Sequence, residues 1–176
     1  MASTFQFIED NGAVIGNPPR GTTRTFNRGE MNWKNSDSST DAYSSFPITT
    51  GNASFTKYQA GLWTGTFNTI SSAKFGPHTT GLFGAGLTLV ASGTTGYVAP
   101  STTTLAGAPY NVTQPTGIAN FSITLVLNQN GPEFAASTTL STSGYSNYLL
   151  TQLQTTSSAA AGDIALISGT LQWDES

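Results

Sequence analysis

Hydrophobic and polar residues alternate along several stretches of the chain, the pattern expected of β-strands with one buried face. In NFSITLVLN, residues 120–128, the apolar positions 121, 123, 125 and 127 share one side, and hydroxyl residues face the other way. In FTKYQAGLWTGTFNTI, residues 55–70, Phe55, Trp63 and Phe67 share a side. The same pattern predicts further strands in GEMNWKN (29–35), GLTLVAS (86–92), EFAASTTLST (133–142), NYLLTQLQTT (147–156) and DIALISGTLQWDE (163–175).

These segments predict about eight strands separated by turns rich in Gly, Pro, Asn and Ser. The chain has 29 Thr, 20 Ser and 19 Gly, whereas strong helix formers are rare. Only 9% of its residues are charged and 37% are hydrophobic, against about 25% charged in an ordinary soluble domain. We therefore predict an all-β fold, an antiparallel β-sandwich or jelly roll.

Residues 1–29 differ from the rest of the chain. Short apolar clusters, FQFI and AVI, flank Asn11-Gly12, a pair that favours a tight hairpin turn, and Pro18-Pro19 then imposes an extended backbone. We predict that residues 1–29 form an extended N-terminal arm lying along a surface, and that residues 30–176 form the β-sandwich or jelly-roll domain.

Three arginines, Arg20, Arg24 and Arg28, follow the prolines at intervals of four residues. A helix would stack these like charges on one face, and the Gly and Thr residues around them disfavour a helix. In an extended arm the even spacing points all three to the same side. They are either a solvated polar edge or partner-binding residues, each of which donates two hydrogen bonds to a carboxylate of a neighbouring protein.

Charge is distributed unevenly along the chain. All six Lys and Arg residues lie in the first 74 positions, whereas only acids occur from Phe75 onward. The formal net charge of −3 argues against nucleic acid as a main partner, because such binding needs several clustered cations. The acidic end around Asp174 and Glu175 is one candidate partner for the arginines of an adjacent copy.

Candidate catalytic groups are sparse, and we expect no enzymatic activity and no cofactor. The single histidine, His78, has no acid within 30 residues on either side, and there is no Cys to act as a thiol nucleophile or metal ligand. In NSDSSTD, residues 35–41, oxygen-bearing side chains alternate as in a calcium loop. Thr40 and Phe46 replace the glycine and the distal glutamate of that pattern, so a solvated turn is favoured over a calcium site.

Two loops stand out, residues 76–86 and residues 92–117. The second is long, uncharged and contains Tyr97, Val98 and Tyr110, which suit a contact surface. No stretch is apolar enough to cross a bilayer, and MASTFQFIEDNG lacks the features of a secretory signal. We expect a soluble protein, made in a reducing cytoplasm and with no membrane partner.

The C-terminal segment YSNYLLTQLQTTSSAAAGDIALISGTLQWDES, residues 145–176, resembles the end of small β-rich virion proteins of tailed bacteriophages. NWKNSDSSTDAYSSFPIT and FTKYQAGLWTGTF are similar to segments of such proteins. The resemblance implies a capsid decoration or cement protein that binds the major capsid protein on the outer surface of the head and gathers there as a homotrimer. Its location would then be the virion.

Two other functions remain open on the sequence. One is a structural component of a phage tail, and the other is a glycan- or receptor-binding β-module that uses Trp63 or Tyr97 as an exposed platform. Each tryptophan falls on the apolar side of its own predicted strand: Trp33, Trp63 and Trp173. This favours a buried core position for each over an exposed platform.

Overall fold

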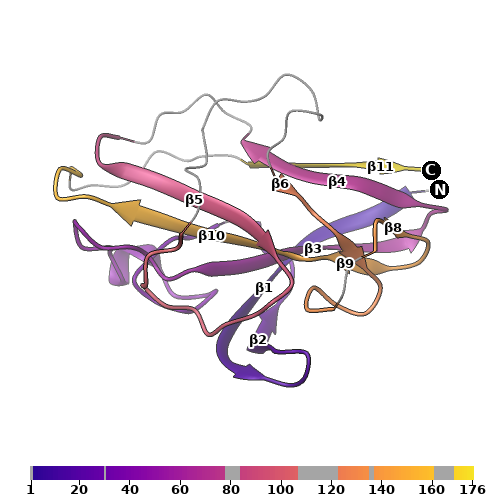
Figure 1. Cartoon of the computed structure of the whole chain (residues 1–176), viewed down its shortest axis with the longest axis horizontal. Coiled ribbons are helices and arrows are strands. Elements are labelled where there is room, and N and C mark those ends of the chain that lie inside the picture. Colours follow the sequence, from indigo (N-terminus) through magenta and orange to yellow (C-terminus); the bar gives the residue numbers. More distant parts are fainter. Residues whose placement is uncertain (1, 30, 78–83, 107–122, 135–136, 161–168) are drawn as a thin grey trace.

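The computed structural model describes residues 2–29, 31–77, 84–106, 123–134, 137–160 and 169–176 (Figure 1). In these ranges nearly all regular structure is β-strand, every ladder is antiparallel, and the strands form two sheets. The predicted all-β antiparallel sandwich is therefore confirmed. Among the described residues no helix is long and apolar enough to cross a membrane.

The larger sheet has the order β2-β1-β3-β10-β5, with β9 also beside β3 and β7 beside β9. Its strands are β1 (Ala2–Ile15), β2 (Arg20–Thr25), β3 (Lys57–Thr66), β5 (Leu87–Thr94), β7 (Leu127–Asn128), β9 (Gly144–Ser146) and β10 (Tyr148–Thr155). The smaller sheet has the order β11-β4-β6, with β8 beside β4. Its strands are β4 (Ile70–Pro77), β6 (Ile123–Thr124), β8 (Thr139–Leu140) and β11 (Gly169–Glu175); one helical turn, η1 (Tyr43–Ser45), precedes β3.

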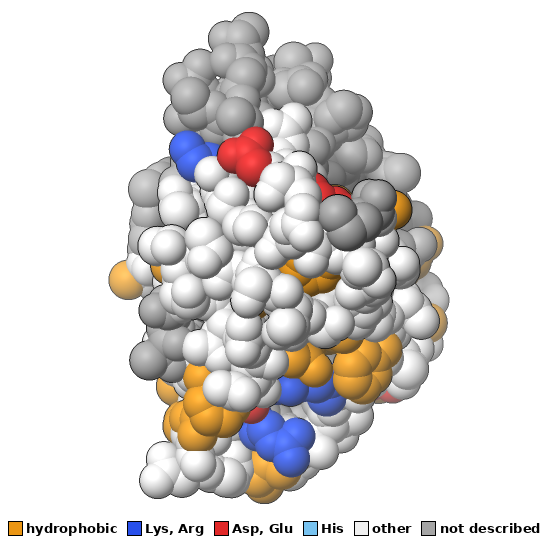
Figure 2. All heavy atoms as spheres, turned by 90° about the vertical axis from the view of Figure 1, so that its right-hand side faces the viewer, with side chains coloured by type: hydrophobic (Ala, Val, Ile, Leu, Met, Phe, Trp, Pro, Cys, Tyr) orange, Lys and Arg blue, Asp and Glu red, His pale blue; other side chains and the backbone are white. Residues whose placement is uncertain are grey.

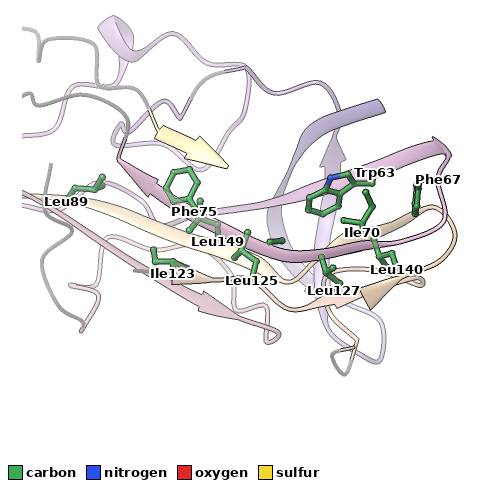
Figure 3. Packing of buried hydrophobic residues seen from close by; sticks show 11 residues of the cluster. Trp63, Phe67, Ile70, Phe75, Leu89, Ile123, Leu125, Leu127, Leu140 and Leu149 are labelled. Atoms are coloured by element: carbon green, nitrogen blue, oxygen red, sulfur yellow. The ribbon is translucent and has the colours of Figure 1, made fainter. Parts of the chain in front are cut away.

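The main core contains side chains from both sheets (Figure 3). Trp63 of β3 is fully buried, and Phe75 of β4 and Leu149 of β10 belong to the same cluster. Trp33 and Trp173 pack against this cluster while partly buried. The inward positions predicted at 123, 125 and 127 are confirmed, whereas Phe121 lies outside the described residues.

A second apolar cluster covers the opposite face of the larger sheet. It contains Ile8, Tyr58, Ala60, Tyr97 and Tyr148, all of them buried. Successive side chains of a strand point to opposite faces. A strand between two clusters must therefore bury both its odd-numbered and its even-numbered residues. Such a strand shows no simple alternation, and this explains why β1 is hard to recognise in the sequence.

Within the predicted extended arm, residues 2–15 form an inner strand of the larger sheet. β1 pairs with β3 from Ala2 opposite Thr66 to Asp10 opposite Tyr58, and with β2 on its other side. The expected turn at Asn11-Gly12 is a bulge in the β1–β2 ladder, and the hairpin turns later, at residues 16–19. Gly12 has a φ of +88°, and a Cβ there would lie 2.1 Å from the Thr22 hydroxyl oxygen, so the bulge requires glycine.

Two predicted strands also change form. The described residues of GEMNWKN make no strand, and Lys34 in this segment is fully buried. The segment around residue 125 is split because it crosses between the sheets: β6 pairs with β4, whereas β7 pairs with β9. At the crossing the Asn147 side chain accepts a hydrogen bond from the Val126 N–H at 3.0 Å, which replaces a ladder bond.

Gly61 lies where the aromatic core meets the middle of β3. A Cβ at this position would lie 2.8 Å from the Phe5 ring and 2.9 Å from the Trp63 ring. We expect Gly61→Ala to lower the free energy of unfolding by about 1–3 kcal/mol through overpacking, measured by urea denaturation. Gly29→Ala is the matched control because a Cβ there meets nothing within 4 Å; equal effects of the two substitutions would contradict the prediction.

Candidate functional site

Two adjacent acids of β1, Glu9 and Asp10, are almost completely buried. Their side chains point to opposite faces of the larger sheet because they are neighbours on one strand. A buried carboxylate is stable only when charges and hydrogen-bond donors surround it. Each acid has its own set of partners, and together these partners hold the N-terminal hairpin on the sandwich.

The Asp10 cluster consists of Asp10, Arg24, Glu133 and Tyr148. Arg24 donates from Nε and Nη2 to the two oxygens of Asp10, both at 2.7 Å, and from Nη2 to Glu133 at 3.0 Å. The Tyr148 hydroxyl donates to Asp10 at 2.5 Å. The fork between Arg24 and Asp10 is the geometry in which a guanidinium binds a carboxylate most strongly. The cluster therefore links β2, β1, β10 and the loop that carries Glu133.

Burial and charge act in opposite directions on Arg24. Burial alone would lower the pKa of its guanidinium, but the hydrogen bonds and charge of Asp10, with a further contribution from Glu133, raise that pKa. Burial, followed by the hydrogen bond to Asp10, raises the pKa of Tyr148. Arg24 thus stays charged and Tyr148 stays protonated near neutral pH.

The Glu9 cluster on the other face consists of Glu9, Lys57, Gln59, Asn11 and Arg28. Lys57 Nζ lies 3.2 Å from one oxygen of Glu9, and Gln59 donates to the other at 3.1 Å. Asn11 donates to Glu9 at 3.1 Å. Arg28 Nε lies 3.7 Å from Glu9, and its backbone N–H donates to the Phe7 carbonyl at 2.9 Å. These contacts bind the segment after β2 to β1.

The loop at residues 35–41, considered above for calcium, is held by lysines and hydrogen bonds. Lys34 donates to the Asp41 carbonyl, and Lys57 to the Ser38 carbonyl at 3.2 Å. Asp37 accepts from the Asn11 side chain at 2.9 Å and from the Gly12 N–H at 2.8 Å. Burial, together with the charge of Lys57, lowers the pKa of Lys34. In the described ranges no group of three His, Cys, Asp or Glu side chains is placed to hold a metal ion.

The three arginines singled out by their spacing have different surroundings. Arg24 and Arg28 contact carboxylates of their own chain, Asp10 and Glu9, so the structure places them in the two buried clusters. Arg20 is exposed at the start of β2, with no partner among the residues that the structure describes. Sequence reasoning missed Glu9 and Asp10 as the partners, although two adjacent acids directly after the apolar pair Phe7-Ile8 were a usable signal.

Arg20 lies beside an exposed apolar surface at the end of the β1–β2 hairpin. Ile15, its cross-strand neighbour, is 37% exposed, and Val14 is 45% exposed. The hairpin projects at the bottom of Figure 1. At the bottom of Figure 2, hydrophobic and Lys or Arg side chains gather, whereas most of the face above them is neither charged nor hydrophobic. We call Val14, Ile15 and Arg20 the hairpin tip; it is the candidate contact site.

Two cavities, of about 230 and 200 Å³, lie away from the ion clusters and are lined mainly by Thr and Asn residues at 49–53, 102–104 and 154–156. Trp63 and Tyr97 are buried, so neither is the exposed platform that a glycan-binding module was expected to use. Instead Tyr97 donates to the Gly12 carbonyl at 2.8 Å and anchors the start of loop 92–117 on the hairpin. His78 and Tyr110 lie outside the described residues.

The Asp10 cluster predicts a large effect of losing its cation. We expect Arg24→Ala to lower the free energy of unfolding by about 3–5 kcal/mol, because the buried carboxylate of Asp10 would lose its charge partner. Lys74→Ala, which removes one positive charge from a half-buried site on β4, is the control and should change stability by less than about 0.5 kcal/mol. Urea denaturation measures both, and a stable Arg24→Ala protein would show that the cluster is not needed for folding.

The two chain ends predict a pH effect. Ser3 donates from its hydroxyl to Glu175 at 2.6 Å and from its N–H at 2.8 Å, and these bonds lower the pKa of Glu175 below 4.5. A depressed carboxyl pKa stabilises the fold above the ordinary pKa and loses that effect as the pH falls through the folded value. Ser3→Ala should therefore lower the melting temperature at pH 7, and the difference from wild type should vanish in acid. Ser44→Ala, at an exposed position, should show no such trend, and a difference that grows in acid would contradict the assignment.

Comparisons with known proteins add no relative to this picture. No family model matches the chain, and no curated protein and no solved structure matches it.

Proposed function

We propose that the protein is a non-enzymatic structural protein of a virus particle, a decoration or cement protein that binds the outer surface of a tailed-phage head and stabilises it. The proposal combines the resemblance of residues 145–176 to small virion proteins with the character of the hairpin tip. It assigns contact with the major capsid protein to Val14, Ile15 and Arg20.

The observation that carries the proposal is a fixed, exposed tip on an almost uncharged surface. Arg20 is the exposed cation of the described residues, whereas Arg24 and Arg28 are used inside the fold. Because Arg24 and Asp10 anchor β2 to β1, the tip keeps its shape without a partner. A preformed contact element loses little conformational entropy on binding, which suits a protein that adds to a finished shell.

Weak single contacts suffice for such a role when symmetry repeats them. One small tip with a single cation gives modest affinity, since an exposed ion pair contributes about 0–1 kcal/mol. Copies that are joined to one another bind one lattice more tightly than a single tip does, because their later contacts form within one assembly. A surface rich in Ser and Thr also limits attraction to other charged partners, so the tip dominates recognition.

The test is co-sedimentation of the purified protein with phage heads stripped of their accessory proteins, at low and at high salt. We expect saturable binding in fixed proportion to the major capsid subunit, weakened by salt. Arg20→Ala should weaken binding by up to about fivefold, or roughly 1 kcal/mol, while leaving the melting temperature unchanged.

Lys74→Ala is the matched control, because it removes the same charge from β4 and should bind like wild type. Replacing all three arginines is a poor test, since loss of Arg24 and Arg28 would disturb the fold itself. Failure of the wild-type protein to bind heads at any salt would overturn the proposal. Assembly of the protein alone into rings or fibres on tails, or saturable binding to a glycan, would then identify one of the alternatives.

A further inference from the structure

Each of the two sheets has an end strand that pairs on one side only, among the described residues. β2 is the last strand of the larger sheet and β11 the last strand of the smaller one. β2 has six residues and β11 has seven. An edge strand presents a row of free N–H and C=O groups, which can pair with a strand of another molecule.

These two edges hold the exposed charges of the described chain. Among its charged residues only Arg20, Asp174 and Glu175 are exposed, and the remaining ones are half-buried or buried. Arg20 is the first residue of β2, whereas Asp174 and Glu175 are the last two of β11. Glu175 is held by Ser3, whereas the described residues give the Asp174 carboxylate no side-chain partner. One edge thus offers a free cation and the other a free anion.

We propose that β2 of one copy pairs antiparallel with β11 of a second copy, with Arg20 opposite Asp174. In this register Thr25 falls opposite Gly169, so every residue of β2 has a partner in β11. Antiparallel pairing is required, because only this direction brings the start of β2 to the end of β11. The inference deepens the proposed function, on which it rests for the presence of many copies side by side. It refines that function by assigning Arg20 to the contact with a second copy and leaving Val14 and Ile15 for the capsid surface.

The charges favour this pairing over contacts between identical edges. Two β2 strands would bring the arginines of both copies to one interface without an exposed acid, and two β11 strands would bring the acids together without a cation. Opposite charges facing each other across a ladder stabilise it by about 0.2–1 kcal/mol, whereas like charges destabilise it. The β2–β11 contact is the combination that pairs a cation with an anion.

A contact between two different edges is head-to-tail, so a pair of copies still has one free β2, on one copy, and one free β11, on the other. Such contacts close into a ring when the rotation between copies allows it, and otherwise they extend into a filament. A closed ring would pair every β2 edge with a β11 edge. Val14 and Ile15 of the hairpin tip would then lie beside the contact between copies, where they remain available to a capsid surface.

The test uses the full-length protein without phage particles. Sedimentation velocity at low salt should show concentration-dependent self-association, weakened about tenfold by Arg20→Glu and equally by Asp174→Arg. The double variant R20E/D174R restores the opposite charges in reversed order and should recover self-association. Hydrogen exchange should show that amides of residues 20–25 and 169–174 become protected as concentration rises.

The matched control is K74E/D174R, which has the same net charge as R20E/D174R but leaves Arg20 in place; it should remain impaired. A wild-type protein that stays monomeric, or a double variant that stays as weak as the single ones, would overturn the β2–β11 contact. Neither result bears on attachment to phage heads, which is measured separately, so the failure of one proposal is distinguishable from the failure of the other.

Discussion

The rest of the structure depends on the burial of two adjacent carboxylates in β1. Glu9 and Asp10 point to opposite faces of the larger sheet, and a buried charge without partners would cost several kcal/mol. Each acid therefore requires its own cations and donors, Lys57 on one face and Arg24 on the other. Since these partners come from β3 and β2, their ion pairs and the backbone ladders hold β1 in the same register between its neighbours.

This internal use of charge explains the uncharged character of the surface. The chain has few charged residues, and six of the thirteen that the structure describes face one another in the two clusters. Arg20, Asp174 and Glu175 are then the charges left on the exterior, at the edges of the two sheets. The clusters also make the hairpin part of the fold. A tip that is rigid before binding suits a contact element better than a flexible arm, because little order must be created on association.

Tyrosines link the hairpin to the rest of the sandwich on the outer face of the larger sheet. Tyr97 reaches the Gly12 carbonyl, and its ring lies 4.7 Å from that of Tyr58. The sequence suggested that Tyr97 and Val98 belong to a contact surface. In the structure Tyr97 is buried, whereas Val98 is 66% exposed. The first part of the long loop covers the second apolar cluster, because Tyr97 and Leu105 pack there beside Tyr148 of the Asp10 cluster.

The sequence by itself determined the all-β class and the inward side of the regular strands, because period-two alternation reports which face of a strand is buried. Trp63 and positions 123–127 were predictable on that ground. Only the tertiary structure decided the place of β1 and the roles of the arginines. β1 is covered on both faces, so its buried residues do not alternate, and Arg24 meets Glu133 across 109 residues of chain. The spacing along the sequence predicts only whether the arginines share a side of a strand. Their roles depend on which carboxylates the fold brings beside them.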